Sequence, residues 1–280
     1  MLGGTGMLGH EAVRVLAGDF QVHASVRDVA AAERHDLPAE LHAFDAYASE
    51  ELPDLLERSA PHAVVNCIGI VKQLEDASRP LPAIEINSLF PHRLAEACAA
   101  RGIRLLHLST DCVFSGELPA AAAYREDSVP DPRDLYGRSK LLGEVTEGDA
   151  LTLRTSIIGW ELGRASGLLE WAASQAGKDV RGFAGAIFSG LTTRALSRGI
   201  GALVRDFPGL RGLYHVSAEP ISKYDLLVAV NSALDLDLRI ERVEEPRINR
   251  ALDSSRLRAA TGLEIPTWPQ MVAEYAKERV

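Results

Sequence analysis

Short apolar runs alternate along the chain with longer stretches whose apolar positions have helical spacing. The short runs predict buried strands, and the longer amphipathic stretches predict helices. This alternation is typical of parallel βαβ units, so we expect an α/β fold with a doubly wound parallel sheet of the Rossmann type. The predicted strands cover residues 21–26, 62–67, 103–108, 151–154 and 212–217, and the predicted helices cover 7–18, 47–58, 81–101, 136–147 and 192–206.

The regular alternation weakens after residue 157, which predicts a second and smaller domain. We expect residues 1–157 plus 190–218 to form a dinucleotide-binding domain. Residues 158–189 plus 219–280 are then a substrate-binding cap domain with a helix-rich tail. Two stretches, 31–41 and 117–134, predict loops or short helices.

The beginning of the chain departs from this pattern. Only Met1 and Leu2 precede the first glycine, whereas a dinucleotide-binding sheet normally begins with a buried strand. We therefore expect the first strand to be missing, either because the start is placed too far downstream or because the chain is truncated. The alternative is a domain that lacks this strand. Unpaired backbone groups beside the gap would lower stability and weaken cofactor binding.

Composition narrows the function classes. The chain has 280 residues, enough for a sizeable core, and its net charge of -9 argues against a broad nucleic-acid surface. No apolar run approaches the roughly 20 residues of a membrane span, and no signal peptide is visible. Three widely spaced cysteines indicate free thiols in a reducing cytoplasm. No group of cysteines and histidines has zinc-ligand spacing, so no metal site is expected.

A glycine-rich loop stands before the first predicted helix. Gly3, Gly6 and Gly9 lie in GGTGMLG, and such a loop lets the backbone approach a pyrophosphate at a helix N-terminus. A turn of purely structural use is the alternative. The next predicted strand ends at Arg27 and Asp28. Arg27 would pair with the 2′-phosphate of NADP, whereas Asp28 would bind the ribose hydroxyl of NAD.

Tyr136 and Lys140 are four residues apart at the start of a predicted helix and therefore share one face. A neighbouring ammonium lowers the pKa of a tyrosine, which would make Tyr136 a usable proton donor and acceptor. Thr110 directly follows a predicted strand, where ligands bind in open α/β sheets, and it could donate to a carbonyl oxygen. The alternatives are a surface pair for the first two residues and a capping hydroxyl for Thr110.

Four segments, GGTGMLG, NCIGI, LSTDCVFSG and YGRSK, occur in an order that resembles the extended short-chain dehydrogenase/reductases. The chain is most similar to the dTDP-4-dehydrorhamnose reductases and related nucleotide-sugar reductases. Further matching segments are LRTSIIG, FSGLTT, GLYHVSAEPISKYDLL and RALDSSRLRAATG, so the resemblance covers nearly the whole chain. It implies a cytoplasmic NAD(P)-dependent oxidoreductase that reduces a 4-keto nucleotide sugar in deoxysugar or surface-polysaccharide synthesis. NADPH is the expected cofactor, with NADH as an alternative, and a homodimer is compatible with the family.

The resemblance also assigns site residues, with Thr110, Tyr136 and Lys140 as the catalytic group. The expected cofactor contacts are Gly3, Thr5, Gly6, Met7, Leu8, Gly9, Arg27, Asp45, Cys67, Ile68, Gly69, Asn87, Thr155 and Ile158. The expected substrate contacts are Lys72, Asp111, Trp160 and Ser189.

Two other functions stay open. The regulatory subunit of methionine adenosyltransferase is similar to this family, so the chain could bind NADP without turnover. A nucleotide-sugar epimerase or dehydratase shares the fold. Dehydratases usually carry a glutamate after the aspartate of LSTD, where this chain has Cys112, and this argues against that class.

Overall fold

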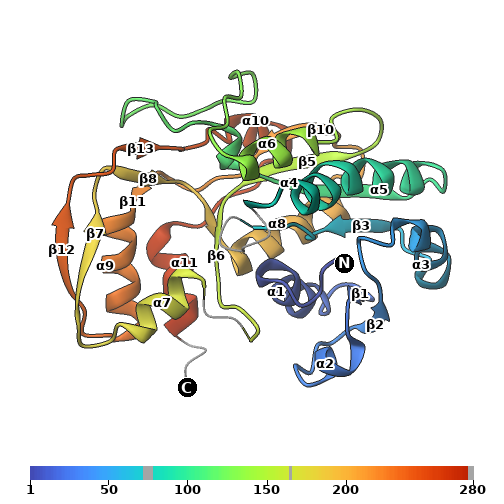
Figure 1. Cartoon of the computed structure of the whole chain (residues 1–280), viewed down its shortest axis with the longest axis horizontal. Coiled ribbons are helices and arrows are strands. Elements are labelled where there is room, and N and C mark those ends of the chain that lie inside the picture. Colours follow the sequence, from blue (N-terminus) through green and yellow to red (C-terminus); the bar gives the residue numbers. More distant parts are fainter. Residues whose placement is uncertain (72–77, 164–165, 277–280) are drawn as a thin grey trace.

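The computed structural model of the protein describes residues 1–71, 78–163 and 166–276. Parallel strands form its central sheet in the order β2-β1-β3-β4-β5-β10, with the first residues of the chain between β1 and β3 (Figure 1). The strands predicted from the alternation are all present. A further strand, β2, begins at the end of the stretch 31–41, which was expected to hold loops or short helices. The bounds are β1 (His23–Val26), β2 (Glu40–Ala43), β3 (Ala63–Asn66), β4 (Arg104–Thr110), β5 (Leu151–Thr155) and β10 (Gly212–His215).

Met1 and Leu2 occupy the place of the expected central strand. The Leu2 amide donates to the carbonyl of Val65 at 2.9 Å, and the Cys67 amide donates to the carbonyl of Leu2 at 3.1 Å. On the other side, the Ser25 amide donates to the carbonyl of Met1 at 2.9 Å. The expected gap is thus partly filled, because these two residues bridge β1 and β3 through backbone hydrogen bonds. Leu2 is also buried, at 4% exposure.

Helices cover both faces of the sheet, as a parallel sheet requires. Successive strand residues face opposite sides. Accordingly, Val65 and Leu106 belong to the core shared with α1 and α8, whereas Val64 and Leu105 pack with α3 and α5. The helices around the sheet are α1 (Met7–Leu16), α2 (Val29–Glu33), α3 (Leu52–Ser59), α4 (Pro80–Ala83), α5 (Phe90–Ala99), α6 (Leu135–Leu142) and α8 (Thr193–Asp206).

Several helices are shorter than the periodicity predicts. The helix expected over 81–101 is divided into α4, a π-helical segment Ile84–Leu89, and α5. The helix expected over 136–147 ends at Leu142. The next residue, Gly143, lies so close to the backbone of Asn87 that a Cβ there would be 1.9 Å from its carbonyl oxygen. Short 3-10 turns also occur at Ser49–Glu51 and Asp111–Val113.

The C-terminal part carries small sheets as well as helices, although we expected mainly helices after residue 219. Figure 1 shows β7, β8, β11, β12 and α9 together at the end of the molecule opposite β1 and β2. The strand predicted over 212–217 does return to the central sheet, since β10 pairs with β5. The domain boundaries themselves stay a prediction. The elements are β6 (Ile157–Ile158), α7 (Leu168–Ser174), β7 (Asp179–Phe183), β8 (Ala186–Phe188), β9 (Leu191–Thr192), β11 (Ile221–Ser222), α9 (Lys223–Leu234), β12 (Arg239–Val243), β13 (Ile248–Asn249), α10 (Ser255–Thr261) and α11 (Trp268–Ala276).

Candidate active site

The glycine loop turns tightly between the bridging residues and α1. Gly3 has a φ of +80°, and its amide donates to the Ser25 hydroxyl at 3.2 Å. The Gly4 amide donates to the Ser25 carbonyl at 2.8 Å. A Cβ on Gly9 would lie 2.0 Å from the carbonyl oxygen of Gly3, so no larger residue fits there. The loop therefore requires glycine at Gly3 for its conformation and at Gly9 for its close packing.

Helix α1 begins directly after this loop. Gly6 is its N-cap and supplies no capping side chain, so the first turn presents backbone N–H groups and the positive end of the helix dipole. Thr5 and Met7 are partly exposed at this end. Leu8 is buried in the core, so any cofactor contact at that position would have to come from its backbone.

The two candidates for reading the cofactor ribose differ in what they contact. Arg27 is exposed just past the end of β1. The Asp28 carboxylate caps α2 by accepting from the Ala31 amide at 3.0 Å. Asp45 is exposed after β2 and accepts from the Tyr47 amide at 3.1 Å. The Asp28 carboxylate already caps α2. The exposed guanidinium of Arg27 therefore favours the 2′-phosphate of NADP over the unphosphorylated ribose of NAD.

The segment after β3 lies against the glycine loop. A Cβ on Gly3 would be 3.1 Å from the Ile68 side chain, and the Cys67 thiol donates to the Met1 sulfur at 3.4 Å. Burial raises the pKa of Cys67 to about 12, so this thiol is not a nucleophile at neutral pH. A Cβ on Gly69 would be 3.9 Å from Lys140 Nζ. The structure thus brings Ile68 to the glycine loop and Gly69 to the lysine of α6.

Asn87 connects this segment to α6. Its side-chain oxygen accepts from the Ile70 amide at 2.9 Å, and its side-chain nitrogen donates to the Ile70 carbonyl at 3.0 Å. The same nitrogen donates to the Ser139 hydroxyl at 3.2 Å. Asn87 is fully buried, so it fixes the strand end and the helix relative to each other rather than facing a ligand.

Thr110 is the last residue of β4 and lies beside Tyr136. Its hydroxyl accepts from the Cys112 amide at 3.1 Å and donates to Asp111 at 3.2 Å, and it lies near enough to Tyr136 to lower the pKa of the phenol, against the larger effect of burial. Burial raises the pKa of the Asp111 carboxyl above its usual range. Helix α6 approaches closely because residue 137 is glycine: a Cβ on Gly137 would be 2.2 Å from the Cys112 carbonyl oxygen.

The ionisation of Tyr136 and Lys140 differs from the expectation. Burial raises the pKa of Tyr136 above its usual range, opposite to the direction predicted from a neighbouring ammonium. Lys140 Nζ instead donates to the Leu108 carbonyl at 2.7 Å. Burial lowers the pKa of Lys140 to about 8, although the nearby charge of Glu144 acts in the opposite sense. Tyr136 is therefore a protonated phenol at neutral pH, the form required of a proton donor.

Ser109, Glu144 and Arg154 form a buried hydrogen-bond network near Lys140, which was not predicted from the sequence. Glu144 accepts from the Ser109 hydroxyl at 2.6 Å and from two nitrogens of Arg154 at 2.7 and 2.8 Å. Arg154 also lies 5.1 Å above the Phe114 ring and 3.5 Å from His215 Nε2. Burial and the charge of Arg154 lower the pKa of His215 to about 4. The available signal was the position of Glu144, four residues after Lys140.

The residues expected near the nicotinamide follow β5. Thr155 ends this strand, and its hydroxyl donates to the Ser156 carbonyl at 3.4 Å. Ile158 is buried, and its carbonyl accepts from the hydroxyl of Tyr275 at 3.0 Å. This contact ties α11 to the segment between the sheet and the C-terminal part.

The residues expected to contact the substrate differ in their burial and in their hydrogen bonds. Ser189 is buried, and its hydroxyl accepts from the Leu252 amide at 2.9 Å, so it holds the C-terminal segment in place. Trp160 is half-buried beside the core of the sheet. Lys72 lies outside the residues that the structure describes.

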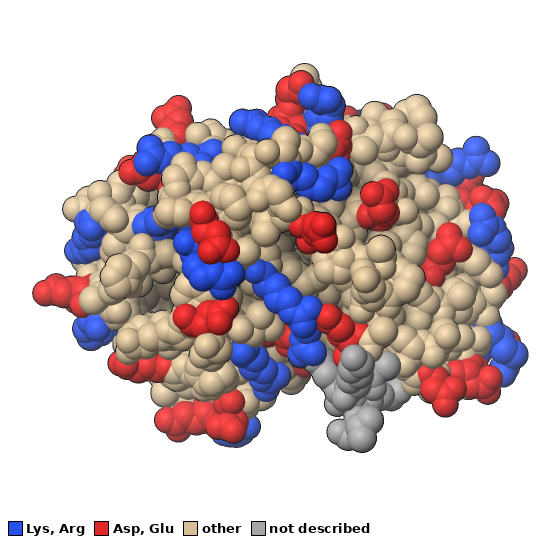
Figure 2. All heavy atoms as spheres, turned by 180° about the vertical axis from the view of Figure 1, so that it is seen from behind, with Lys and Arg blue, Asp and Glu red and all other residues tan. Residues whose placement is uncertain are grey.

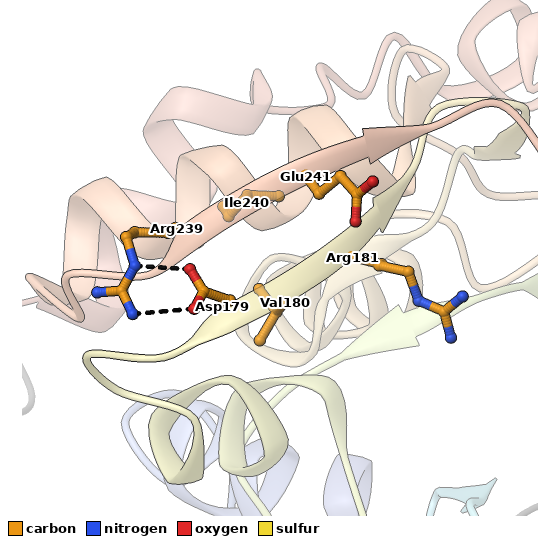
Figure 3. Close-up of a pocket in the computed structure, with 6 residues that line it drawn as sticks. All are labelled: Asp179, Val180, Arg181, Arg239, Ile240 and Glu241. Carbon is orange, nitrogen blue, oxygen red and sulfur yellow. Dashed lines mark hydrogen bonds and ion pairs between the residues drawn. The ribbon is translucent and has the colours of Figure 1, made fainter.

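Two other features of the described surface are the distribution of its charges and a groove in the C-terminal part. Basic and acidic side chains are interspersed on the face shown in Figure 2. In the part of the chain that the structure describes, no helix has the length and apolarity needed to cross a membrane. The groove in Figure 3 lies over the paired strands β7 and β12, where an exposed ion pair joins Asp179 and Arg239 at 2.6 Å. None of the predicted site residues lines it, and exposed pairs contribute little free energy.

A parallel sheet with a glycine loop and a threonine, tyrosine and lysine at one edge defines a Rossmann-type protein of the short-chain dehydrogenase/reductase class. Within this class, the chain belongs to the family described as the RmlD substrate binding domain, whose model matches residues 1–280.

Curated relatives agree with this assignment. A probable low-salt glycan biosynthesis reductase of Haloferax volcanii, Agl14, is 36% identical over 180 residues, 61% of this chain and 58% of that protein. A probable dTDP-4,6-dihydroxy-2-methyloxan-3-one 4-ketoreductase of Streptomyces antibioticus is 32% identical over 84% of this chain and 76% of its own length. The mouse methionine adenosyltransferase 2 subunit beta is 26% identical over 99% of this chain and 89% of its own. The chain thus spans little more than half of the Haloferax relative.

Solved structures share the fold. A hypothetical dTDP-4-dehydrorhamnose reductase from Sulfolobus tokodaii has a TM-score of 0.78 at 26% identity, covering 94% of this chain and 95% of its own. The dTDP-4-dehydrorhamnose reductase of Bacillus anthracis, solved in complex with NADP, has a TM-score of 0.80 at 20% identity and covers 100% and 98%.

Proposed function

We propose that this protein uses NADPH, or alternatively NADH, to reduce the 4-keto group of a nucleotide sugar. The observation that carries the proposal is the grouping of Thr110, Tyr136 and Lys140. Thr110 ends β4 and lies near the Tyr136 phenol, whose pKa it influences, and Lys140 Nζ reaches the space beside Gly69. This is a pair of hydroxyl groups next to a buried cation, at the strand ends where open α/β sheets bind ligands.

The residues present fit a dinucleotide. The glycine loop leaves no room for side chains, and uncapped N–H groups of α1 follow it, which suits a pyrophosphate. Arg27 would hold a 2′-phosphate, and the Cys67–Gly69 segment and Lys140 would hold the ribose next to the nicotinamide. When bound, the dinucleotide would supply the hydride for the reduction.

The protein's own part is to bind and protonate the keto oxygen. Thr110 and Tyr136 would donate hydrogen bonds to this oxygen, where negative charge develops during reduction. Tyr136 would then transfer its proton to the oxygen. The raised pKa keeps the phenol protonated before the reaction, and the Lys140 ammonium would stabilise the phenolate that forms. The network behind Lys140, formed by Glu144, Arg154 and Ser109, would keep this cation in position.

The relatives named as reductases of dTDP-linked sugars support a nucleotide-sugar substrate. Asp111 and Trp160 stay our candidates for contacts with it, together with Ser189. We also propose a cytoplasmic location, because the described cysteines are free thiols. The homodimer compatible with the family stays a prediction that light scattering after gel filtration would test.

A second candidate is a cofactor-binding subunit without turnover. The similarity to the mouse methionine adenosyltransferase subunit over 99% of this chain favours it. The complete group of Thr110, Tyr136 and Lys140 favours the reductase.

The test is NADPH oxidation, followed by absorbance, with a panel of dTDP- and UDP-linked 4-keto sugars. We expect oxidation that depends on one of these sugars and is faster than with the matched 4-hydroxy sugar. Saturable NADPH binding with no sugar-dependent oxidation across the panel would favour the second candidate. Absence of NADPH and NADH binding would contradict both.

A further inference from the structure

Three side chains of metal-ligand type meet at the edge of the central sheet. His23 is the first residue of β1, and Glu40 is the first residue of β2, directly opposite it in the register. His42 follows two residues later on β2 and therefore points to the same side as Glu40. Their ligand atoms all lie within 4.8 Å of one another.

The separations match tetrahedral coordination. His23 Nδ1 and His42 Nε2 are hydrogen-bonded to each other at 2.9 Å, so a bound ion would replace the proton between them. Glu40 Oε2 lies 3.7 Å from the first nitrogen, and Glu40 Oε1 lies 3.6 Å from the second. Ligands about 2.0–2.1 Å from a tetrahedral zinc ion are about 3.3–3.4 Å apart. Each observed distance is within about half an ångström of that value, so small rotations of the side chains would place an ion between them.

The surroundings hold the two imidazoles in place. The side chains of His23 and His42 are 20% and 10% exposed, whereas that of Glu40 is 62% exposed. The charged groups around His42 are Glu40, His23, Arg58 and the N-terminal ammonium.

We propose that His23, Glu40 and His42 form a binding site for a divalent transition-metal ion of the zinc type. Two nitrogens and one carboxylate oxygen suit such an ion, and water would fill the fourth position. Hard cations such as Mg²⁺ prefer a set of oxygen ligands. A bound ion would cross-link β2 to β1 (Figure 1), its only neighbour in the described sheet.

This site is separate from the proposed reductase site. The glycine loop contacts β1 near its other end, where the Gly4 amide donates to the Ser25 carbonyl at 2.8 Å. The sequence did not reveal the cluster. Glu40 and His42 are near each other in the sequence, but His23 joins them only because β1 pairs with β2.

The experiment uses the full chain without a histidine tag, freed of metal with EDTA and titrated calorimetrically with zinc chloride alone. We expect saturable binding of one ion per chain, a higher melting temperature with zinc, and no comparable effect of magnesium chloride. His42→Gln and Glu40→Gln should each weaken zinc binding at least about tenfold, since even outer-shell changes cost 10–100-fold. The matched control is His62→Gln, at an exposed histidine outside the cluster.

Absence of saturable zinc binding to the parent would overturn the proposal. So would unchanged affinity in both variants, or an equal loss in His62→Gln. If His42→Gln alters the melting temperature without metal, Glu40→Gln decides, because its side chain is largely exposed.

Discussion

The close contact at Gly137 offers a sharp test of how α6 positions the tyrosine. In Gly137→Ala, the new Cβ would meet the Cys112 carbonyl oxygen at 2.2 Å and the Pro132 Cβ at 2.9 Å. The first neighbour is backbone and cannot rotate away. The helix must therefore move from the turn after β4, and Tyr136 moves with it away from Thr110.

The geometry sets the size of the effect. Real Cβ contacts essentially never fall below 3.0 Å, so lengthening 2.2 Å to 3.0 Å requires a shift of at least 0.8 Å. A misplacement of about 1 Å at a reacting group can reduce the rate about 10²-fold. Overpacking of this kind also costs about 1–3 kcal/mol of stability. We therefore expect kcat/KM to fall about 100-fold while the chain still folds.

The assay combines sugar-dependent NADPH oxidation with thermal unfolding. Gly199→Ala is the matched control, because a Cβ at Gly199 in α8 meets nothing within 4 Å. That variant should keep its activity and melt at the same or a slightly higher temperature, since alanine favours helix. If Gly137→Ala keeps kcat/KM within about twofold of the parent, this account of positioning is wrong.

Three further predictions concern cofactor choice and stability. Arg27→Ala should raise the Kd of NADPH by about one to two decades and that of NADH much less, as measured by fluorescence titration; equal losses would remove Arg27 from phosphate recognition. Leu2→Ala should lower the free energy of unfolding in urea by about 2–5 kcal/mol, because the Leu2 side chain is buried in the core; a loss under about 0.5 kcal/mol would show that this packing is unimportant. Protonation of His215 should lower the free energy of unfolding as the pH falls. The unfolded histidine binds a proton near pH 6.5, while the folded one resists until about pH 4. Stability should therefore fall by about 3 kcal/mol across that window, and an equally steep fall in His215→Gln would contradict this.

Strand positions were predictable because buried parallel strands are short apolar runs. Helix lengths were less so. The stretch 81–101 has a continuous helical pattern, yet it contains a π-helical segment, and this segment holds Asn87 and its close contact with Gly143. The bridging role of Leu2 was hidden as well, since one residue cannot show a strand pattern. Its effect comes from hydrogen bonds to both neighbouring strands.

Local motifs gave the positions of the glycine loop and of Thr110, Tyr136 and Lys140. The ionisation of Tyr136 did not follow from its spacing to Lys140, because burial has the larger effect and raises the pKa of the phenol. Lys140 Nζ donates its hydrogen bond to the Leu108 carbonyl. Glu144 lies just after the end of α6, and its ion-pair partner Arg154 lies in β5. The position of Glu144, four residues after Lys140, is a sequence signal for one partner, but only the folded chain brings Arg154 to it.

The central claim is that this chain delivers hydride and proton to a sugar carbonyl. The most direct measurement follows deuterium from NADPH labelled at the nicotinamide C4 into the product of a dTDP-4-keto-6-deoxy sugar, by mass spectrometry and NMR. The account predicts one deuterium at C4 of the sugar, and a rate reduced about 10²–10⁴-fold in Tyr136→Phe with NADPH affinity nearly unchanged. A product without deuterium at C4, or a Tyr136→Phe rate within about twofold of the parent, would contradict it.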